Sequence, residues 1–464
     1  MSGILILALV ISILSHGYYV GTSVRSARDE VNFESVNLNV DLSRVLKRVN
    51  ERFLSVAIDA SLVAEEKFMY LLASPKLRTL AKALSPAFLR FGGTRQDFMT
   101  FNPAFLHSNE YHKNSVFDAD DLCERLELPP ILEERLKQEW ALHEVLLQKE
   151  DLQRKYQSLK FTEYAVDLLY SFTNCSGLDL IFGLNELLRT TGNSWDSSNA
   201  RTLIQYCESK QYSMAWELGN EPNSYEKKAG IRVNGYQLGQ DFIQLRRILR
   251  ESKLYHDTGL YGPDISQPRD HRRDLLEGFL ESGAEAIDAC TWHHYYVNGR
   301  HTSLKDFLDP EVLNTLALKT HEVIKTVDLA SPGKKVWLGE TSSAYGGGAK
   351  GLSDTFVAGF ITSYKSGAIT LFALNLSKSP ASIAVPAMVS NSTVEAFVLQ
   401  SEQPGEEGLY SKSVKLNGEV LKMVDDRTLP SLQGTPLAAG EHLRLPGYSF
   451  AFYLLSEAQA LACR

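Results

Sequence analysis

The sequence predicts an α/β fold: a TIM-type (β/α)8 barrel that lacks one of its units, followed by a C-terminal antiparallel β-sandwich. Seven short apolar segments that end in polar residues or glycine alternate with stretches of helical pattern. This alternation favours a parallel sheet with helical crossovers. From Thr370 onward the helical pattern disappears, and short alternating segments follow one another between Gly, Pro and Asn turns. That change indicates a β-sandwich of roughly 100 residues.

The seven strand-like segments are almost continuously apolar, as expected of parallel strands that are buried on both faces. A closed barrel of this type has eight strands, so the sequence is one unit short. Amphipathic helices are expected between the strands, for example at 237–251 and 273–281. The segments are FLSVAID (53–59), FLRFGGT (88–94), LDLIFGLN (178–185), SMAWELGNE (213–221), GLYGPD (259–264), AIDACTWHHYY (286–296) and KKVWLGE (334–340).

Length and charge limit the class of protein. The chain has 464 residues, which suits a barrel plus a smaller module, and its net charge of −8 argues against a nucleic-acid partner. Residues 4–14 form an apolar run that is too short to span a bilayer. With the small residues that follow, it predicts a secretory signal peptide over 1–17, although no Lys or Arg precedes the run. The alternative is a buried N-terminal strand.

Passage through the secretory pathway would give meaning to other features. Asn174, Asn375 and Asn391 each begin an Asn-x-Ser/Thr sequence and are predicted glycosylation sites. Five cysteines are present, so in an oxidising compartment at least one thiol stays unpaired. No Cys-x-x-Cys and no zinc-type spacing occurs, and we expect neither a metal nor a cofactor.

A strongly acidic segment interrupts the barrel pattern between the second and third strands. Residues 111–153 carry 11 acidic and 5 basic residues, which is most of the net charge of the chain. Its polar ends are plausible sites of proteolytic nicking. The alternative is a solvated helical insertion.

Two glutamates stand where barrel strands end, the position at which barrel active sites form. Glu221 lies in WELGNEPNSY and Glu340 ends VWLGE, and their separation of three strand–helix units places them on the fourth and seventh strands. A pair of carboxylic acids facing each other can split a glycosidic bond, because one donates a proton while the other attacks or activates water. The alternative for Glu221 alone is an ordinary polar turn.

Polar residues at the same strand ends extend this candidate site. Asn220 can hydrogen-bond a sugar hydroxyl, and Tyr295 is placed to orient a carboxylate. His293 and His294 offer donors, or are simply polar residues at a strand end. Gly346–Gly348 can approach a polymer closely, or form a plain loop, and lack the spacing of a phosphate loop.

Basic residues follow three of the strand ends. They are Lys227 and Lys228 after Glu221, Arg269 with Arg272 and Arg273, and Arg300. A solvated surface explains any one cluster, but three on one barrel face in an acidic protein predict an anionic polymer as substrate.

The segments MAWELGNEPNSY, LYGPDISQPR, TWHHYYVNGR and GKKVWLGETSSAYGGGA closely resemble the heparanase family of endo-β-glucuronidases, from about Val31 to the C-terminus. The resemblance implies a retaining mechanism, with Glu221 as acid/base and Glu340 as nucleophile. It also implies a domain order: an N-terminal segment 18–52 that adds a sandwich strand, a barrel over 53–360 and a sandwich over 370–464. Implied substrate contacts are Asp59, Thr94, Asn220, Tyr295, Gly346 and Gly347, and implied heparin contacts are Arg154, Lys155, Lys227, Lys228, Arg269 and Arg300.

The resemblance also implies partners and processing. Heparan sulfate, heparin and proteoglycans are the expected partners, in lysosomes, in the extracellular matrix and at the cell surface. A cathepsin-type protease would excise residues 111–153 and leave a small and a large chain associated. Cys123 and Cys175 are the expected disulfide pair. The family's non-hydrolytic paralogue lacks the nucleophile, which Glu340 argues against.

The chain departs from the family after LSDTFVAGF (352–360), where the resemblance implies that roughly 80 residues, about two βα-unit lengths, are missing. A barrel without its eighth strand exposes two sheet edges. The sequence therefore predicts a heparanase-type enzyme with both catalytic glutamates and an incomplete scaffold. Two alternatives remain: a splice isoform that binds heparan sulfate without hydrolysing it, and a lectin-like scaffold with no role in glycan recognition.

Overall fold

The computed structural model describes residues 34–37, 43, 50–65, 69–103, 123, 131, 132, 134, 135, 138, 156–267, 273–345, 368–384 and 391–458. The predicted signal peptide and most of the acidic segment lie outside these residues. The described chain forms two compact units. One contains Glu51–Tyr295 and Leu318–Thr341, and the other contains Tyr296–Ala317 and the C-terminal strands.

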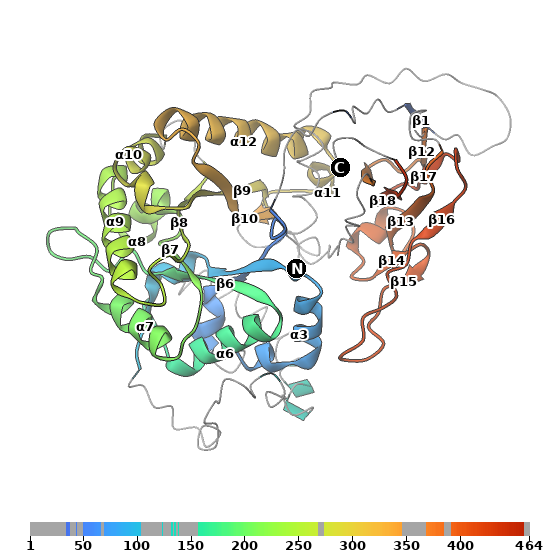
Figure 1. Ribbon diagram of the computed structural model, residues 1–464. Coiled ribbons are helices and arrows are strands. Elements are labelled where there is room, and N and C mark those ends of the chain that lie inside the picture. Colours follow the sequence, from blue (N-terminus) through green and yellow to red (C-terminus); the bar gives the residue numbers. More distant parts are fainter. Residues whose placement is uncertain are drawn as a thin grey trace. The chain divides into compact units, whose positions relative to one another are not determined.

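The first unit is built on a seven-stranded parallel sheet that curls into a nearly closed barrel (Figure 1). The sheet order is β10-β9-β8-β7-β6-β3-β2, so consecutive barrel strands are neighbours. Each predicted segment supplies one strand, which confirms the predicted fold class. The strands are β2 (Val56–Asp59), β3 (Ala87–Gly92), β6 (Leu178–Leu184), β7 (Ala215–Leu218), β8 (Leu260–Ser266), β9 (Ala289–Asn298) and β10 (Lys335–Tyr345).

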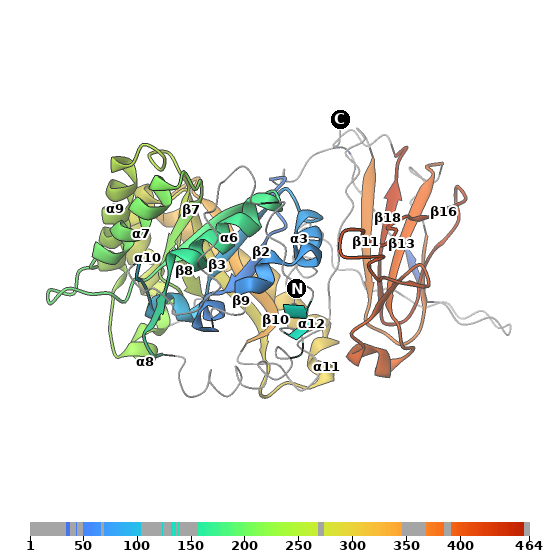
Figure 2. The ribbon, with the colours of Figure 1, turned by 90° about the horizontal axis from the view of Figure 1, so that it is seen from below.

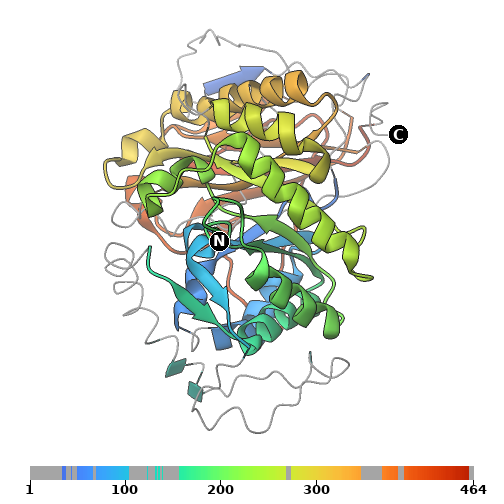
Figure 3. The same cartoon turned by 90° about the vertical axis from the view of Figure 1, so that its left-hand side faces the viewer.

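Helices connect the strands and cover the outer face of the sheet, as α7, α9 and α10 show in Figures 1 and 3. The predicted helix at 237–251 begins earlier, because the side chain of Asn234 caps it by accepting the amide of Gln237. The helices are α3 (Pro75–Lys82), α6 (Glu163–Cys175), α7 (Ser198–Ser209), α8 (Tyr225–Ala229), α9 (Gly235–Glu251), α10 (Arg273–Gly283), α11 (Leu304–Phe307) and α12 (Pro310–Ala330).

Burial along the strands reflects the missing unit. β6, β7 and β8 are almost entirely buried, whereas β10 is only half-buried along most of its length and β2 alternates between half-buried and exposed. β2 and β10 end the sheet order, and among the described residues no further strand pairs with either. The barrel therefore has two open edges, and β10, which carries Glu340, forms one of them.

An apolar layer fills the barrel interior. Ile181, Tyr261 and Ala289 form a cluster with Phe88, Ala215 and Trp337, one residue from each of six neighbouring strands. Alternate residues of a strand share a face, so the residues two positions later point into the barrel one layer nearer the carboxyl ends. Two of these residues are charged, Arg90 and Glu217, and both are buried. The interior thus changes from apolar to charged toward the edge where barrel active sites form.

The second unit is a β-sandwich with a mixed small sheet (Figure 2). Its larger sheet is antiparallel, in the order β11-β18-β13-β14-β15 with β16 also paired to β13, and its smaller sheet has the order β1-β12-β17. Strand β1 runs parallel to β12, so an N-terminal segment lies beside C-terminal strands. The strands are β1 (Glu34–Asn37), β11 (Ile369–Asn375), β12 (Ala381–Ala384), β13 (Val394–Ser401), β14 (Val414–Leu416), β15 (Glu419–Val420), β16 (Thr435–Leu437), β17 (Leu443–Leu445) and β18 (Ser449–Leu455).

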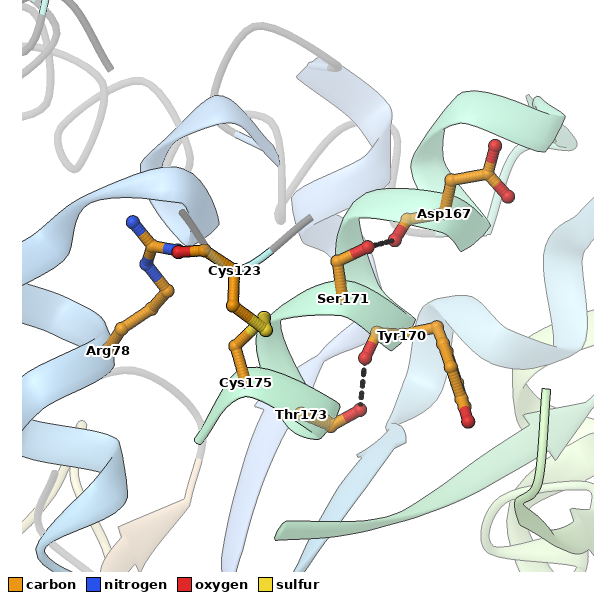
Figure 4. The surroundings of a disulfide bond; sticks show 7 residues. All are labelled: Arg78, Cys123, Asp167, Tyr170, Ser171, Thr173 and Cys175. Atoms are coloured by element: carbon orange, nitrogen blue, oxygen red, sulfur yellow. Dashed lines mark hydrogen bonds between the residues drawn. A yellow bond between two sulfur atoms is a disulfide. The ribbon is translucent and has the colours of Figure 1, made fainter. Parts of the chain in front are cut away.

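The cysteines behave as expected where they are described. Cys123 and Cys175 form a disulfide at the end of α6, and Arg78 donates to the carbonyl of Cys123 at 2.8 Å (Figure 4). Cys207 and Cys290 are free and buried. Cys463 lies outside the described residues.

The predicted glycosylation sites differ in accessibility. Asn174 and Asn391 are exposed, which suits a glycan. Asn375 is buried, and its Nδ2, the atom that would carry the sugar, donates to the carbonyls of Ser379, Leu445 and Pro446. The folded chain therefore does not fit glycosylation at Asn375, because this amide serves to hold a β-sandwich corner.

Replacing Gly239 by alanine should destabilise the barrel. A Cβ there would lie 2.0 Å from the Oγ of Ser282 and 2.8 Å from the backbone nitrogen of Gly283, so α9 and α10 would have to separate. We expect a loss of about 1–3 kcal/mol in unfolding free energy, typical of overpacking. Chemical denaturation measures this loss. Gly192→Ala is the control, because its new Cβ meets nothing closer than 3.8 Å, and equal effects in both variants would contradict the prediction.

Candidate active site

The candidate site is organised around Arg90, whose guanidinium lies inside the barrel. Its Nε donates to Glu217 at 2.6 Å, Nη1 to Glu340 at 2.9 Å and Nη2 to Asn220 at 3.0 Å. Asp264 lies 3.7 Å from Nη2. One cation therefore binds side chains that follow from the fourth, fifth and seventh strands, and a planar fork of donors suits this arrangement better than a point charge.

The two buried carboxyl groups beside Arg90, those of Glu217 and Asp264, have pKa values that are shifted in opposite directions. Burial raises the pKa of Glu217, and the negative charge of Asp264 adds to this, although Arg90 opposes both. For Asp264, burial would raise the pKa, but Arg90 and His293 outweigh it and lower the pKa. The geometry therefore favours an ionised Asp264 beside a Glu217 that retains its proton more readily.

Glu221 occupies a strained turn directly after β7. Gly219 has a φ of 75° and Glu221 a φ of 53°, a left-handed conformation that a glutamate rarely adopts. The amide of Glu221 donates to the carbonyl of Asp264 at 2.9 Å, which fixes the turn to the next strand. Its side chain is 21% exposed, so the carboxylate remains accessible. Backbone strain of this kind is common at functional sites.

His293 connects the two glutamates of the predicted pair. Its Nδ1 lies 3.5 Å from Oε1 of Glu221 and 3.9 Å from Oε2 of Glu340, while its Nε2 lies 3.1 Å from Oδ1 of Asp264. The nearest oxygens of Glu221 and Glu340 can be no farther apart than the sum of the two Nδ1 distances. This upper limit on the distance between the two carboxylates is compatible with the separation of about 5–5.5 Å found in retaining glycosidases. The structure therefore brings the two predicted carboxylates together.

The neighbouring histidines His293 and His294 have opposite electrostatic surroundings. Burial would lower the pKa of His293, but the carboxylates of Glu340, Asp264 and Glu221 raise it to about 10. Burial, together with a smaller effect of the nearby Lys319, lowers the pKa of His294 to about 4. At neutral pH, His293 is an imidazolium among carboxylates and His294 is a neutral ring.

The charge on His293 determines the state of Glu221. Burial would raise the pKa of Glu221, but His293 and Lys228 outweigh it and lower the pKa to about 2. Lys228 lies 3.5 Å from Oε2 of Glu221 and donates to the carbonyl of Asn220 at 3.3 Å. Without a ligand, Glu221 is thus a carboxylate between two cations.

Glu340 is held by two donors. Arg90 binds its Oε2, and the hydroxyl of Tyr295 donates to its Oε1, as the sequence predicted for a tyrosine that orients a carboxylate. Both oxygens are therefore directed, and the side chain is 21% exposed. An oriented and accessible carboxylate can act as a nucleophile.

The other predicted residues are distributed more widely. Asp59 is exposed at the end of β2. Its side chain lies close to Gly93, the residue before Thr94, because a Cβ at Gly93 would be 2.8 Å from Oδ2 of Asp59. Lys227 and Arg300 are exposed. Lys228 differs from them, because its side chain is only 6% exposed and its Nζ lies 3.5 Å from Oε2 of Glu221. Gly346, Gly347, Arg154, Lys155 and Arg269 lie outside the described residues.

Arg90 and Glu217 were not predicted as site residues from the sequence. Both are charged residues inside apolar segments, FLRFGGT and MAWELGNE. A charged residue within a strand that is buried on both faces needs a partner of opposite charge, so this feature could have identified the pair.

The charged groups of the site are carboxylates, the imidazolium of His293, the guanidinium of Arg90 and the ammonium of Lys228. Among the described residues, no group of three or more His, Cys, Asp or Glu side chains is arranged to hold a metal ion.

No helix in the described part of the chain is long and apolar enough to cross a membrane.

Comparisons with known proteins find relatives among glycoside hydrolases. The model of the N-terminal domain of glycosyl hydrolase family 79 matches residues 154–365. Chicken heparanase is 40% identical over 507 aligned positions, covering 92% of this chain and 97% of the relative. Human inactive heparanase-2 is 34% identical, covering 92% and 89%. The alignment with the chicken protein is longer than this chain, as expected if this chain lacks a segment that the relative contains.

Among solved structures, a 4-O-α-L-rhamnosyl-β-D-glucuronidase from Fusarium oxysporum superposes with a TM-score of 0.54 at 13% identity. The match covers 90% of this chain and all of that one. At this identity the likeness concerns the fold alone.

The opposite charge states of His293 and His294 should be directly measurable. Nitrogen chemical shifts at neutral pH should show both ring nitrogens of His293 protonated and a neutral ring at His294, with His293→Gln and His294→Gln assigning the signals. Since the folded pKa of His293 lies above its ordinary value of about 6.5, its contribution to stability is complete below about pH 6.5 and is lost as pH rises toward 10. A neutral His293 at pH 7 would contradict this arrangement.

Replacing Arg90 by lysine should strongly destabilise the barrel. A single ammonium cannot reach Glu217, Asn220 and Glu340 together, so buried acceptors lose their donors. We expect a loss of about 3 kcal/mol or more in unfolding free energy, measured by chemical denaturation. Arg201→Lys, in an exposed pair with Glu251, should leave the midpoint unchanged. A variant at Arg90 as stable as the control would show that the guanidinium does not organise the site.

Proposed function

Because the chain belongs to the heparanase family of glycosyl hydrolase family 79, we propose that it is a retaining endo-β-glucuronidase that cleaves heparan sulfate, with Glu340 as nucleophile and Glu221 as acid/base. One observation carries the proposal: carboxylates from the fourth and seventh strands approach the same nitrogen of His293. The class is that of a glycoside hydrolase, and the residue roles are the proposed part.

In the proposed first step, Glu340 attacks the anomeric carbon of a glucuronide while Glu221 protonates the departing glycosidic oxygen. The covalent glucuronyl ester on Glu340 is then hydrolysed by water, from which Glu221 removes a proton. Arg90 and Tyr295 would direct Glu340 by holding both of its oxygens. Asn220, bound to Arg90 through its side-chain oxygen, would present its amide hydrogens to the sugar.

The proton on Glu221 must come from a change on substrate binding. A proton donor works best with a pKa near the operating pH, whereas His293 and Lys228 lower the pKa of Glu221 to about 2. An anionic sugar that draws Lys228 or His293 toward its own carboxylate would separate Glu221 from a cation and raise its pKa. The substrate would thereby prepare its own proton donor.

Recognition of an anionic polymer is proposed from charge. Lys227 and Arg300 are exposed basic residues. Arg154, Lys155 and Arg269 are proposed to join them, and Asp59, Thr94, Gly346 and Gly347 to contact the sugar near the reacting centre. Secretion, lysosomal delivery, cathepsin-type excision of 111–153 and association of the two resulting chains are proposed on the family relationship.

A second candidate function is supported by the open barrel edges. Glu340 lies on β10, which is half-buried and ends the sheet, so its position depends on few neighbours. A relative that is named inactive heparanase-2 is 34% identical in sequence to this chain. An isoform that binds heparan sulfate without cleaving it is therefore the alternative.

The proposed roles predict distinct chemical rescue. A heparan sulfate oligosaccharide with a dinitrophenyl group on the scissile β-glucuronide supplies a leaving group that needs no acid. With added azide, Glu340→Gly should release the α-glucuronyl azide, and Glu221→Ala the β-glucuronyl azide through the covalent intermediate. On natural heparan sulfate, Glu221→Ala should lose about 10²–10⁴-fold in kcat.

The same variants separate the two candidate functions. If the parent chain and Glu340→Gln are equally inert on heparan sulfate but both bind heparin with a strong salt dependence, the binding function is correct. If neither binds heparin, both candidates fail. Exchange of the two azide products between the variants would reverse the roles of the glutamates.

A further inference from the structure

A second buried polar network lies behind the catalytic turn and takes no part in the proposed mechanism. Its centre is Asp97, on the 3-10 helix η3 (Thr94–Phe98) that follows β3. Oδ2 of Asp97 accepts the amide of Asn220 at 3.0 Å, and Oδ1 accepts the hydroxyl of Tyr225 at 3.0 Å. Asn220 precedes Glu221 and Tyr225 follows it, so one carboxylate holds the turn on both sides of Glu221.

The turn requires such support. Glu221 adopts a left-handed conformation, which is sterically unfavourable for a residue with a side chain. Gly219 is tightly packed, since a Cβ there would lie 2.2 Å from the hydroxyl of Tyr225 and 2.8 Å from the Cβ of Glu186. A strained segment keeps its conformation only where surrounding contacts determine it.

Asp97 belongs to a buried set of hydrogen bonds and ion pairs that extends to α9. The amide of Glu186 approaches Oδ1 of Asp97 at 3.4 Å, and the carboxyl of Glu186 binds Arg189 at 2.6 Å. Arg189 in turn binds Asp241 on α9 at 2.8 Å. The carboxyl groups of Asp97, Glu186 and Asp241 are buried, so water cannot readily replace a lost contact.

We propose that Asp97 is a positioning residue for the proton donor: its bonds to Asn220 and Tyr225 set the direction in which Glu221 presents its carboxyl group. This inference rests on the proposed function of Glu221. Asp97 acts through the turn and does not contact the substrate, so its loss should affect the step that Glu221 catalyses more than substrate binding.

The test uses the full chain with Asp97→Asn and Tyr225→Phe. On natural heparan sulfate both should lower kcat by about 10–100-fold with little change in KM, the size expected when a reacting group is displaced by about 1 Å. On the dinitrophenyl substrate, whose leaving group needs no acid, the loss in kcat/KM should be several times smaller than on heparan sulfate, because kcat/KM reports the first step and not the hydrolysis of the ester, in which Glu221 acts as base. Asp167→Asn is the matched control, because Asp167 is a buried carboxylate of α6 that accepts the hydroxyls of Tyr206 and Tyr212. It should lower stability without altering the ratio of the two rates.

Amide hydrogen exchange gives a measurement that needs no activity. In Asp97→Asn and Tyr225→Phe, the amides of peptides spanning 215–228 should exchange faster than in the parent chain. In Asp167→Asn, their exchange rate should equal that of the parent chain. If the parent chain cleaves nothing, the proposed function fails. The exchange measurement then shows by itself whether Asp97 holds the turn around Glu221. If Glu221→Ala is inactive on heparan sulfate while Asp97→Asn matches the parent in both rates and in exchange, the inference is overturned and the proposed function stands. Equal losses on both substrates would also overturn it, since they indicate a general structural role.

Discussion

The placement of a single guanidinium inside the barrel determines the arrangement of the site. Arg90 replaces the apolar filling of the interior with charge, and it joins Glu217, Asn220 and Glu340 to one centre. A buried cation of this kind is favourable only when its partners are present, because an isolated charge in the interior is costly. Glu340, one of the two carboxylates proposed to perform glycoside hydrolysis, is therefore also one of the groups that stabilise the centre of the barrel.

The second cation, His293, balances the same carboxylates from the other side. It stays protonated because Glu340, Asp264 and Glu221 surround it, and its charge in turn keeps Glu221 ionised. Without a ligand the site is thus balanced as ion pairs, and catalysis requires that this balance change when an anionic sugar enters. The arrangement explains how one group of side chains can serve both the stability of the resting state and the chemistry.

Much of the fold follows from the sequence, because a strand buried on both faces must be apolar along its whole length. LDLIFGLN (178–185) shows this best, because six of the seven residues of β6 are buried. Counting such segments also predicted a barrel that is one unit short. The pairing of Glu221 with Glu340 followed from strand ends and unit spacing. The contacts of Arg90 did not, since a strand pattern gives burial but not the partner of a buried charge. The inward orientation of the Lys228 and Asn375 side chains did not follow either, because local sequence does not reveal that a side chain turns inward.

The connections of Arg90 also have a kinetic consequence. Its partners Glu217, Asn220 and Glu340 lie 127, 130 and 250 residues away along the chain. Contacts between such distant residues form late and slowly, because long loops must close before any contact stabilises them. During synthesis, the strand that carries Arg90 therefore emerges long before Glu340 exists to neutralise it. A nascent chain of this type has to keep a charged strand exposed, and the final strand completes the charge balance of the barrel and its active site at the same moment.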